Sequence, residues 1–202
     1  MTRRIDDHIA RRRAAAVAGH RGDDATARKL LGDDHPAVRA TALGALARSG
    51  GLTDADLAAG LADASPSVRA RAAELTGSRP GDGPPPLRPA LADTDPAVVE
   101  AAAWASGERQ PPEAGIVATL AGVATGHDDP LCREAAVAAL GAIGDADGLP
   151  AVLAATGDRP AVRRRAVLAL APFDGPEVDA ALERALGDRD WQVRQAAEDI
   201  AR

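Results

Sequence analysis

Residues 33–46, Asp-Asp-His-Pro-Ala-Val-Arg-Ala-Thr-Ala-Leu-Gly-Ala-Leu, form a unit that recurs with changes five more times in the chain. One position of the unit anchors every copy, and the anchors are Pro36, Pro66, Pro96, Pro130, Pro160 and Trp191. The steps between anchors are 30, 30, 34, 30 and 31 residues. A fixed period of about 20 to 50 residues is typical of an array of stacked structural repeats.

Each copy has the features of a helix start followed by a helix. A carboxylate such as Asp33 can accept hydrogen bonds from the free N–H groups of a first helical turn, and proline fits that turn because its missing N–H needs no partner. Apolar residues then follow at helical spacing, in the first copy Val38, Ala42, Leu43 and Leu46. Alanine holds one central place throughout and predicts close helix packing: Ala42, Ala72, Ala102, Ala136, Ala166 and Ala197.

The pattern D-x-x-P-x-V-R-x-x-A-x-x-x-L on a step near 30 residues resembles the HEAT repeat, and more narrowly the short HEAT-like repeats named after phycobilisome (PBS) lyases. The resemblance covers nearly the whole chain. It implies an all-α fold, a right-handed α-solenoid of about six HEAT-like repeats. In that family each repeat is a pair of antiparallel helices, the motif opens the second helix, and the second helices line a concave surface.

We expect residues 1–202 to form a single solenoid domain. Residues 1–19 would be an N-terminal cap helix, and 174–202 a C-terminal cap repeat with a polar outer face. The Pro/Gly-rich stretch 78–86 predicts a loop within repeat three, either a tolerated surface insertion or a rim that shapes a binding edge. The predicted first helices of the repeats are 23–32, 53–61, 86–92, 111–124, 147–155 and 174–187.

Composition narrows the function classes. The net charge is −6 and the pI about 5.2, which argues against a dedicated nucleic-acid-binding protein. Residues 1–29 nevertheless carry +4, and their run Arg11-Arg12-Arg13 would be either a solvated outer face or a phosphate-binding patch. With a single cysteine, no apolar run long enough to span a membrane and no signal segment, we expect a cytoplasmic protein without membrane association.

A row of arginines follows the second apolar position of the motif. In HEAT-like repeats such arginines pair with aspartates of neighbouring repeats and fix the stacking, a role that suits the planar guanidinium. We prefer this structural interpretation to a cationic ligand ladder. The predicted members are Asp33, Asp63, Asp93, Asp188, Arg39, Arg69, Arg133, Arg163 and Arg194. Val99 interrupts the row and predicts weaker stacking of repeat three.

The partner-binding face is predicted from positions four and eight residues beyond each anchor, which share one side of a helix. Trp104 lies near the middle of this stripe, and tryptophan and arginine dominate binding energy at interfaces. The alternative is that the proline-rich loop covers Trp104. The predicted binding residues are Trp104, Glu100, Glu74, Arg164, Arg165 and Leu168.

We find no sequence pattern for catalysis, cofactor binding or metal binding. The four histidines have no ligand spacing, and the His-Glu dipeptides that hold iron in the HEAT-like deoxyhypusine hydroxylase do not occur. We therefore expect a non-catalytic scaffold that binds a protein of unknown identity, as a monomer or weak oligomer. The alternatives are a subunit of a HEAT-like lyase or another enzyme, and a DNA-binding protein similar to the HEAT-like alkylpurine glycosylases.

Overall fold

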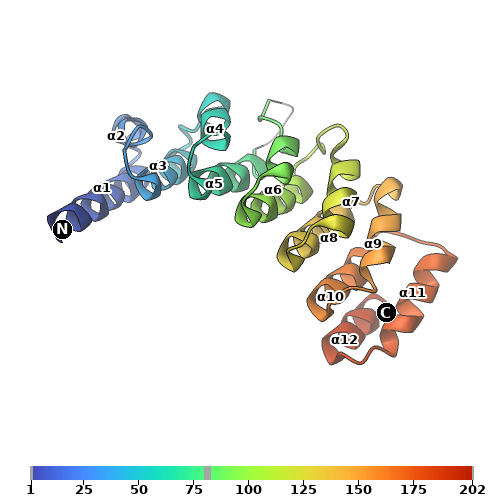
Figure 1. Ribbon diagram of the computed structural model, residues 1–202. Coiled ribbons are helices and arrows are strands. Elements are labelled where there is room, and N and C mark those ends of the chain that lie inside the picture. The colour runs from blue at the N-terminus through green and yellow to red at the C-terminus, as the bar shows by residue number, and fades with distance from the viewer. Residues whose placement is uncertain (1, 80–82, 202) are drawn as a thin grey trace. The chain divides into compact units, whose positions relative to one another are not determined.

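The computed structural model describes residues 2–79 and 83–201, with side chains from residue 7 onward. Every regular element in this part of the chain is a helix (Figure 1). The fold divides into two compact units, unit 1 (Met1–Pro86) and unit 2 (Leu87–Arg202), which are described separately below. Their boundary coincides with the end of the predicted loop 78–86. Residues 80–82 of that loop lie outside the described residues, and its other members are non-helical.

Unit 1 has two rows of helices. One row holds α1 (Thr2–Arg21), α3 (Pro36–Ser49) and α5 (Pro66–Gly77), and the other holds α2 (Asp24–Leu30) and α4 (Asp54–Leu61) (Figure 1). The repeated sequence unit opens α3 and α5, so helices of this row are called motif helices and those of the other row partner helices. A motif helix packs against its own partner helix and against the next motif helix.

Unit 2 continues the same alternation. Its motif helices are α6 (Pro96–Glu108), α8 (Pro130–Ile143), α10 (Pro160–Ala169) and α12 (Trp191–Ile200). Its partner row consists of η1 (Arg88–Ala92), α7 (Ile116–Gly126), η2 (Ala146–Gly148) with α9 (Leu149–Ala155), and α11 (Pro176–Leu186). The predicted alternation of first and second helices is therefore present in both units.

Three predicted helices of the partner row are wrong in detail. Repeat three has only the 3-10 turn η1, because the prolines before it cannot enter a helix interior. The helix of repeat four begins at Ile116 rather than residue 111, and Gly115, at φ 74° in the left-handed region, directly precedes it. The predicted helix 147–155 consists of η2 and α9.

The cap of a motif helix is the residue directly before the anchor, not the aspartate three positions before it. Asp95, Asp129 and Asp190 accept hydrogen bonds from backbone N–H groups in the first turns of α6, α8 and α12. His35 does the same for α3 through Nδ1, at 3.2 Å from the nitrogen of Ala37. Asp33 instead accepts from the His35 N–H, which leaves its carboxylate free to point toward another repeat.

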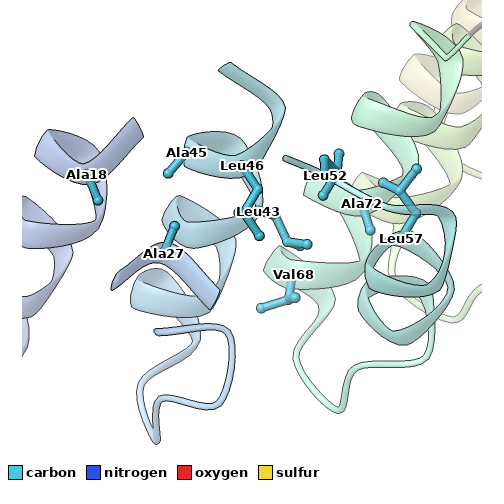
Figure 2. Packing of buried hydrophobic residues seen from close by; sticks show 9 residues of the cluster. All are labelled: Ala18, Ala27, Leu43, Ala45, Leu46, Leu52, Leu57, Val68 and Ala72. Carbon is cyan, nitrogen blue, oxygen red and sulfur yellow. The ribbon is translucent and has the colours of Figure 1, made fainter. Parts of the chain in front are cut away.

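The core consists of small aliphatic side chains between the two rows. In unit 1, Leu43 and Leu46 of α3 pack with Leu57 of α4 and with Val68 and Ala72 of α5 (Figure 2). The six central alanines have no exposed surface, as the sequence predicts: Ala42, Ala72, Ala102, Ala136, Ala166 and Ala197. The core is thin because each layer is only two helices deep.

Candidate partner-binding face

The arginines of the motif connect successive repeats. Arg39 binds Asp63 bidentately, with Nε–Oδ2 and Nη2–Oδ1 distances of 2.8 and 2.7 Å. Arg163 binds Asp188 in the same way, at 3.0 and 2.8 Å. These hydrogen bonds lower the pKa of the Asp63 and Asp188 carboxyls. Such pairs, called rungs below, hold one motif helix to the start of the next.

Each arginine of the row also holds the turn of its own repeat. Its Nη1 donates to the backbone carbonyl at the start of its own motif, over 2.7 to 2.9 Å. Arg69 and Arg194 do this through the Asp63 and Asp188 carbonyls. Asp93 accepts from the Asp95 N–H, which is the turn contact that the other aspartates make. One side chain thus stabilises both a turn and, where a rung forms, a stacking contact.

Two rungs include residues that the sequence analysis did not assign to the row. Arg133 binds Asp158, one position later than the other aspartates, at 2.7 and 2.8 Å. Arg11 of α1 binds Asp33 at 2.6 and 3.0 Å, and also pairs with Asp7 and Asp34. Arg11 is therefore a member of the row of rungs, because its guanidinium binds Asp33, while Arg12 and Arg13 of the same run are exposed.

At one place in unit 2, where the row of arginines is interrupted, both the arginine and the aspartate of a rung are replaced by other residues. Val99 replaces the arginine and is fully buried, while His127 occupies the place of the next aspartate. His127 keeps the turn contact, since its Nδ1 accepts from the Asp129 N–H at 3.0 Å. A buried apolar side chain thus stands where the other motif helices have an arginine. Weaker stacking there remains a prediction.

Trp104 is exposed, and its exposed fraction is 40%. The Arg165 guanidinium of α10 lies over its ring, 5.1 Å from the centroid, and also meets Glu134 of α8 at 3.4 Å. Trp104, Arg165 and Glu134 therefore form one cluster across three motif helices of unit 2. Sequence reasoning selected Trp104 and Arg165 but missed their contact, because they lie two repeats apart. Glu134 belongs to the predicted stripe.

A second feature of unit 2 lies between α10 and α12. Arg164 and Leu168 line a hollow of about 210 Å³ together with Trp191 and Gln195. Trp191 is the most exposed large apolar side chain of unit 2, with an exposed fraction of 64%. The sequence analysis treated Trp191 only as the anchor of a cap repeat. Its place in this hollow follows from the packing of α10 against α12.

In unit 1 the predicted stripe lines an open hollow of about 560 Å³. Its floor includes Ala40 and Gly44 of α3 and Ala70 of α5. Glu74 borders it and pairs with Arg71 at 2.7 Å. Glu100, the remaining predicted binding residue, is half-buried on α6. Binding of a partner by any of these residues remains a prediction.

Cys132 is buried, burial raises the pKa of its thiol to about 11, and its Sγ donates to the Pro96 carbonyl. In the described part of the chain, no three His, Cys, Asp or Glu side chains lie together as metal ligands would. None of the helices described combines the length and hydropathy that a membrane crossing requires.

Comparison with known proteins decides the family. Overlapping segments at residues 55–117, 84–160 and 117–201 match the family of HEAT repeats. The chain is a HEAT-repeat protein. The HEAT-repeat fold is all-helical and of the α-solenoid class, as the sequence predicts.

Two solved structures resemble the chain at low sequence identity. Human deoxyhypusine hydroxylase, determined in complex with glycerol, is 21% identical with a TM-score of 0.50, over 96% of this chain and 78% of that one. An engineered protein is 20% identical with a TM-score of 0.49, over 94% of this chain and 87% of that one. No curated protein matches this HEAT-repeat chain. At such identities the likeness to the hydroxylase shows the fold alone.

Proposed function

We propose that this HEAT-repeat protein is a non-catalytic scaffold that binds a protein partner on the exposed face of its unit 2 motif helices. The observation that carries the proposal is the exposed Trp104 beneath the Arg165 guanidinium. An exposed tryptophan stacked with an arginine combines the two residue types that most often dominate interface energy. The wider face includes Glu100, Arg164 and Leu168.

The cluster is arranged before a partner arrives. Glu134 holds Arg165 from one side while the Trp104 ring supports it from the other, so both long side chains have little freedom to lose. Binding is tighter when this ordering cost is already met in the free protein. A partner that covers Trp104 would also exclude water from the Arg165–Glu134 pair, which strengthens the pair.

In this proposal the protein acts in the cytoplasm as a monomer or weak oligomer. The lone buried thiol of Cys132 is compatible with a reducing compartment. Unit 1 has an exposed face of its own, with Glu74 among its residues. HEAT-like folds host unrelated functions, so the proposal rests on the Trp104 cluster rather than on the family.

Affinity capture with three immobilised forms of the chain tests the proposal. The forms are the wild type, Trp104→Ala and the control Leu186→Ala, which removes an exposed apolar side chain from partner helix α11. Mass spectrometry would quantify each retained protein. We expect at least one protein to be retained equally by the wild type and Leu186→Ala and at least tenfold less by Trp104→Ala.

The result that overturns the proposal is equal retention of every protein by Trp104→Ala and the wild type, with unchanged circular dichroism. Retention of only nucleic acid or of a coloured small molecule would also overturn it. The first result would show that Trp104 is not part of the binding site. The second would show that the chain does not act as a protein-binding scaffold.

A further inference from the structure

The hollow of unit 1 is a cationic surface on a chain with a net charge of −6. Each of three motif helices contributes one arginine to it: Arg12 from α1, Arg48 from α3 and Arg71 from α5. The one carboxylate among its lining residues, Glu74, pairs with Arg71. Arg12 and Arg48 have no ion-pair partner among the described residues, and both side chains are exposed.

The floor between these arginines is made of small residues. Ala40 and Ala70 lie on it, and Gly44 has no side chain at all. A Cβ at position 44 would lie 2.8 Å from Nη2 of Arg71, so the glycine makes room for that guanidinium against α3. The Arg71 guanidinium lies against α3 at the floor and pairs with Glu74, whereas Arg12 and Arg48 are exposed without such a partner among the described residues.

We propose that this hollow binds an acidic peptide segment of a partner protein. Carboxylates of the segment would pair with Arg12 and Arg48, and its backbone and apolar side chains would lie on the alanine floor. The inference rests on the proposed protein-binding function but assigns a separate site, in unit 1, and a chemical class of partner. The volume of about 560 Å³ is within the range of roughly 300–1,000 Å³ found for ligand sites.

The lining favours a peptide over a nucleic acid. Single-stranded nucleic acids bind where bases can stack on aromatic rings, and the residues that line this hollow include no aromatic side chain. Arginine suits carboxylates because its planar group forms two parallel hydrogen bonds with them. The rungs of the same chain use that geometry repeatedly, as in Arg39–Asp63.

The test uses a random twelve-residue peptide library displayed on phage and selected on the wild-type chain. We expect the selected peptides to be enriched in Asp and Glu. The most frequent sequence, synthesised with a fluorescent label, would then be titrated by anisotropy against wild type, Arg48→Glu and Lys29→Glu. Lys29→Glu is the matched control, since it makes the same charge change on exposed partner helix α2 of the same unit.

The expected result is a Kd raised at least tenfold by Arg48→Glu, less than twofold by Lys29→Glu, and raised by added salt. Peptides without acidic enrichment, an unchanged Kd for Arg48→Glu, or tighter binding of a single-stranded oligonucleotide would each overturn the inference. Trp104→Ala separates the two proposals. If it weakens the peptide and Arg48→Glu does not, this inference fails while the proposed function stands.

Discussion

At the scale of single residues, the arginine of the motif performs two tasks with one planar group. Arg163 donates through Nη1 to the carbonyl of Asp158 in its own turn, and through Nε and Nη2 to the Asp188 carboxylate of the next repeat. Lysine has no such fork and could make only one of these contacts well. The rung is therefore a two-residue device, and loss of one member leaves the other uncompensated.

The positions of Val99 and His127 allow a test of that argument, because these residues replace the arginine and the aspartate of one rung in unit 2. Val99→Arg would place a guanidinium at a fully buried position without a carboxylate, and we expect it to lower the free energy of unfolding by about 3 kcal/mol. His127→Asp supplies the missing carboxylate. The double variant should recover at least half of the lost free energy of unfolding. Urea unfolding followed by circular dichroism measures this free energy for each variant.

His127→Asp alone is the control for this cycle. Its effect should be small, because an aspartate at that position makes the same turn contact as Asp63 does with the Ser65 N–H. If the two changes are additive, with no recovery in the double variant, then a rung cannot form between these helices and the device is not transferable.

At the scale of helices, a glycine of one motif helix packs closely against an alanine of the next in both units. A Cβ at Gly141 would lie 2.6 Å from the Cα of Ala169, and one at Gly107 would lie 2.8 Å from the Cα of Ala139. Gly19 stands in the same relation to Ala45 in unit 1. The neighbouring backbone, rather than the helix itself, requires glycine at these positions.

Gly141→Ala should therefore destabilise the protein although alanine is the better helix former. The added methyl meets backbone, and such overpacking costs about 1–3 kcal/mol. Gly122→Ala in α7 is the matched control, because a Cβ there meets nothing within 4 Å. It should stabilise by up to about 1 kcal/mol. Urea midpoints of both variants measure this, and a stabilised Gly141→Ala would contradict the packing argument.

The position of the glycine within the motif helix also shows that α1 belongs to the row of motif helices, which the sequence analysis did not recognise. Gly19 follows His8 by the interval that separates Gly107 from Pro96, so α1 is a motif helix whose anchor is a histidine. His8 stacks on His35, with ring centroids 4.0 Å apart. The recurring sequence unit identifies the other motif helices, including α12 with its Trp191 anchor, but not this one, and Arg11 is therefore left outside the predicted row.

Other differences arise where packing rather than local pattern decides. Asp158 forms a rung although it is shifted by one position, because the turn before α10 still directs its carboxylate toward Arg133. Pro111 has the sequence features of a helix start, yet the helix begins at Ile116. The helical stripe placed Trp104 on the predicted binding face but left open whether the proline-rich loop covers it. Its contact with Arg165 depends on how α6, α8 and α10 stack.

At the scale of the molecule, stability depends on carboxylates that recur in both units. Unit 1 contains the rungs of Asp33 and Asp63, and unit 2 those of Asp158 and Asp188. In each case hydrogen bonds from an arginine are the main cause of a lowered pKa, and that of Asp33 falls to about 2. Because all the shifts have one sign, their effects on stability add rather than cancel.

The expected consequence is acid sensitivity. A carboxyl whose pKa is lower in the folded protein than in the unfolded chain, where it is about 3.9, contributes its full stability above that value and loses it as the pH falls through the folded pKa. The melting temperature, followed by circular dichroism, should thus be nearly constant from pH 7 to about pH 5 and then fall steadily toward pH 2.

Arg163→Gln should change the shape of this profile as well as its height. Without the guanidinium, the pKa of Asp188 returns toward its ordinary range, so the variant should lose about 2 kcal/mol at pH 7 and converge on the wild type as the pH approaches 2. Arg184→Gln, at an exposed arginine of α11, is the control and should follow the wild type throughout. If the wild type and Arg163→Gln stay a constant distance apart from pH 7 to pH 2, Arg163 stabilises the stack by packing alone, and the rungs are not the source of the acid sensitivity.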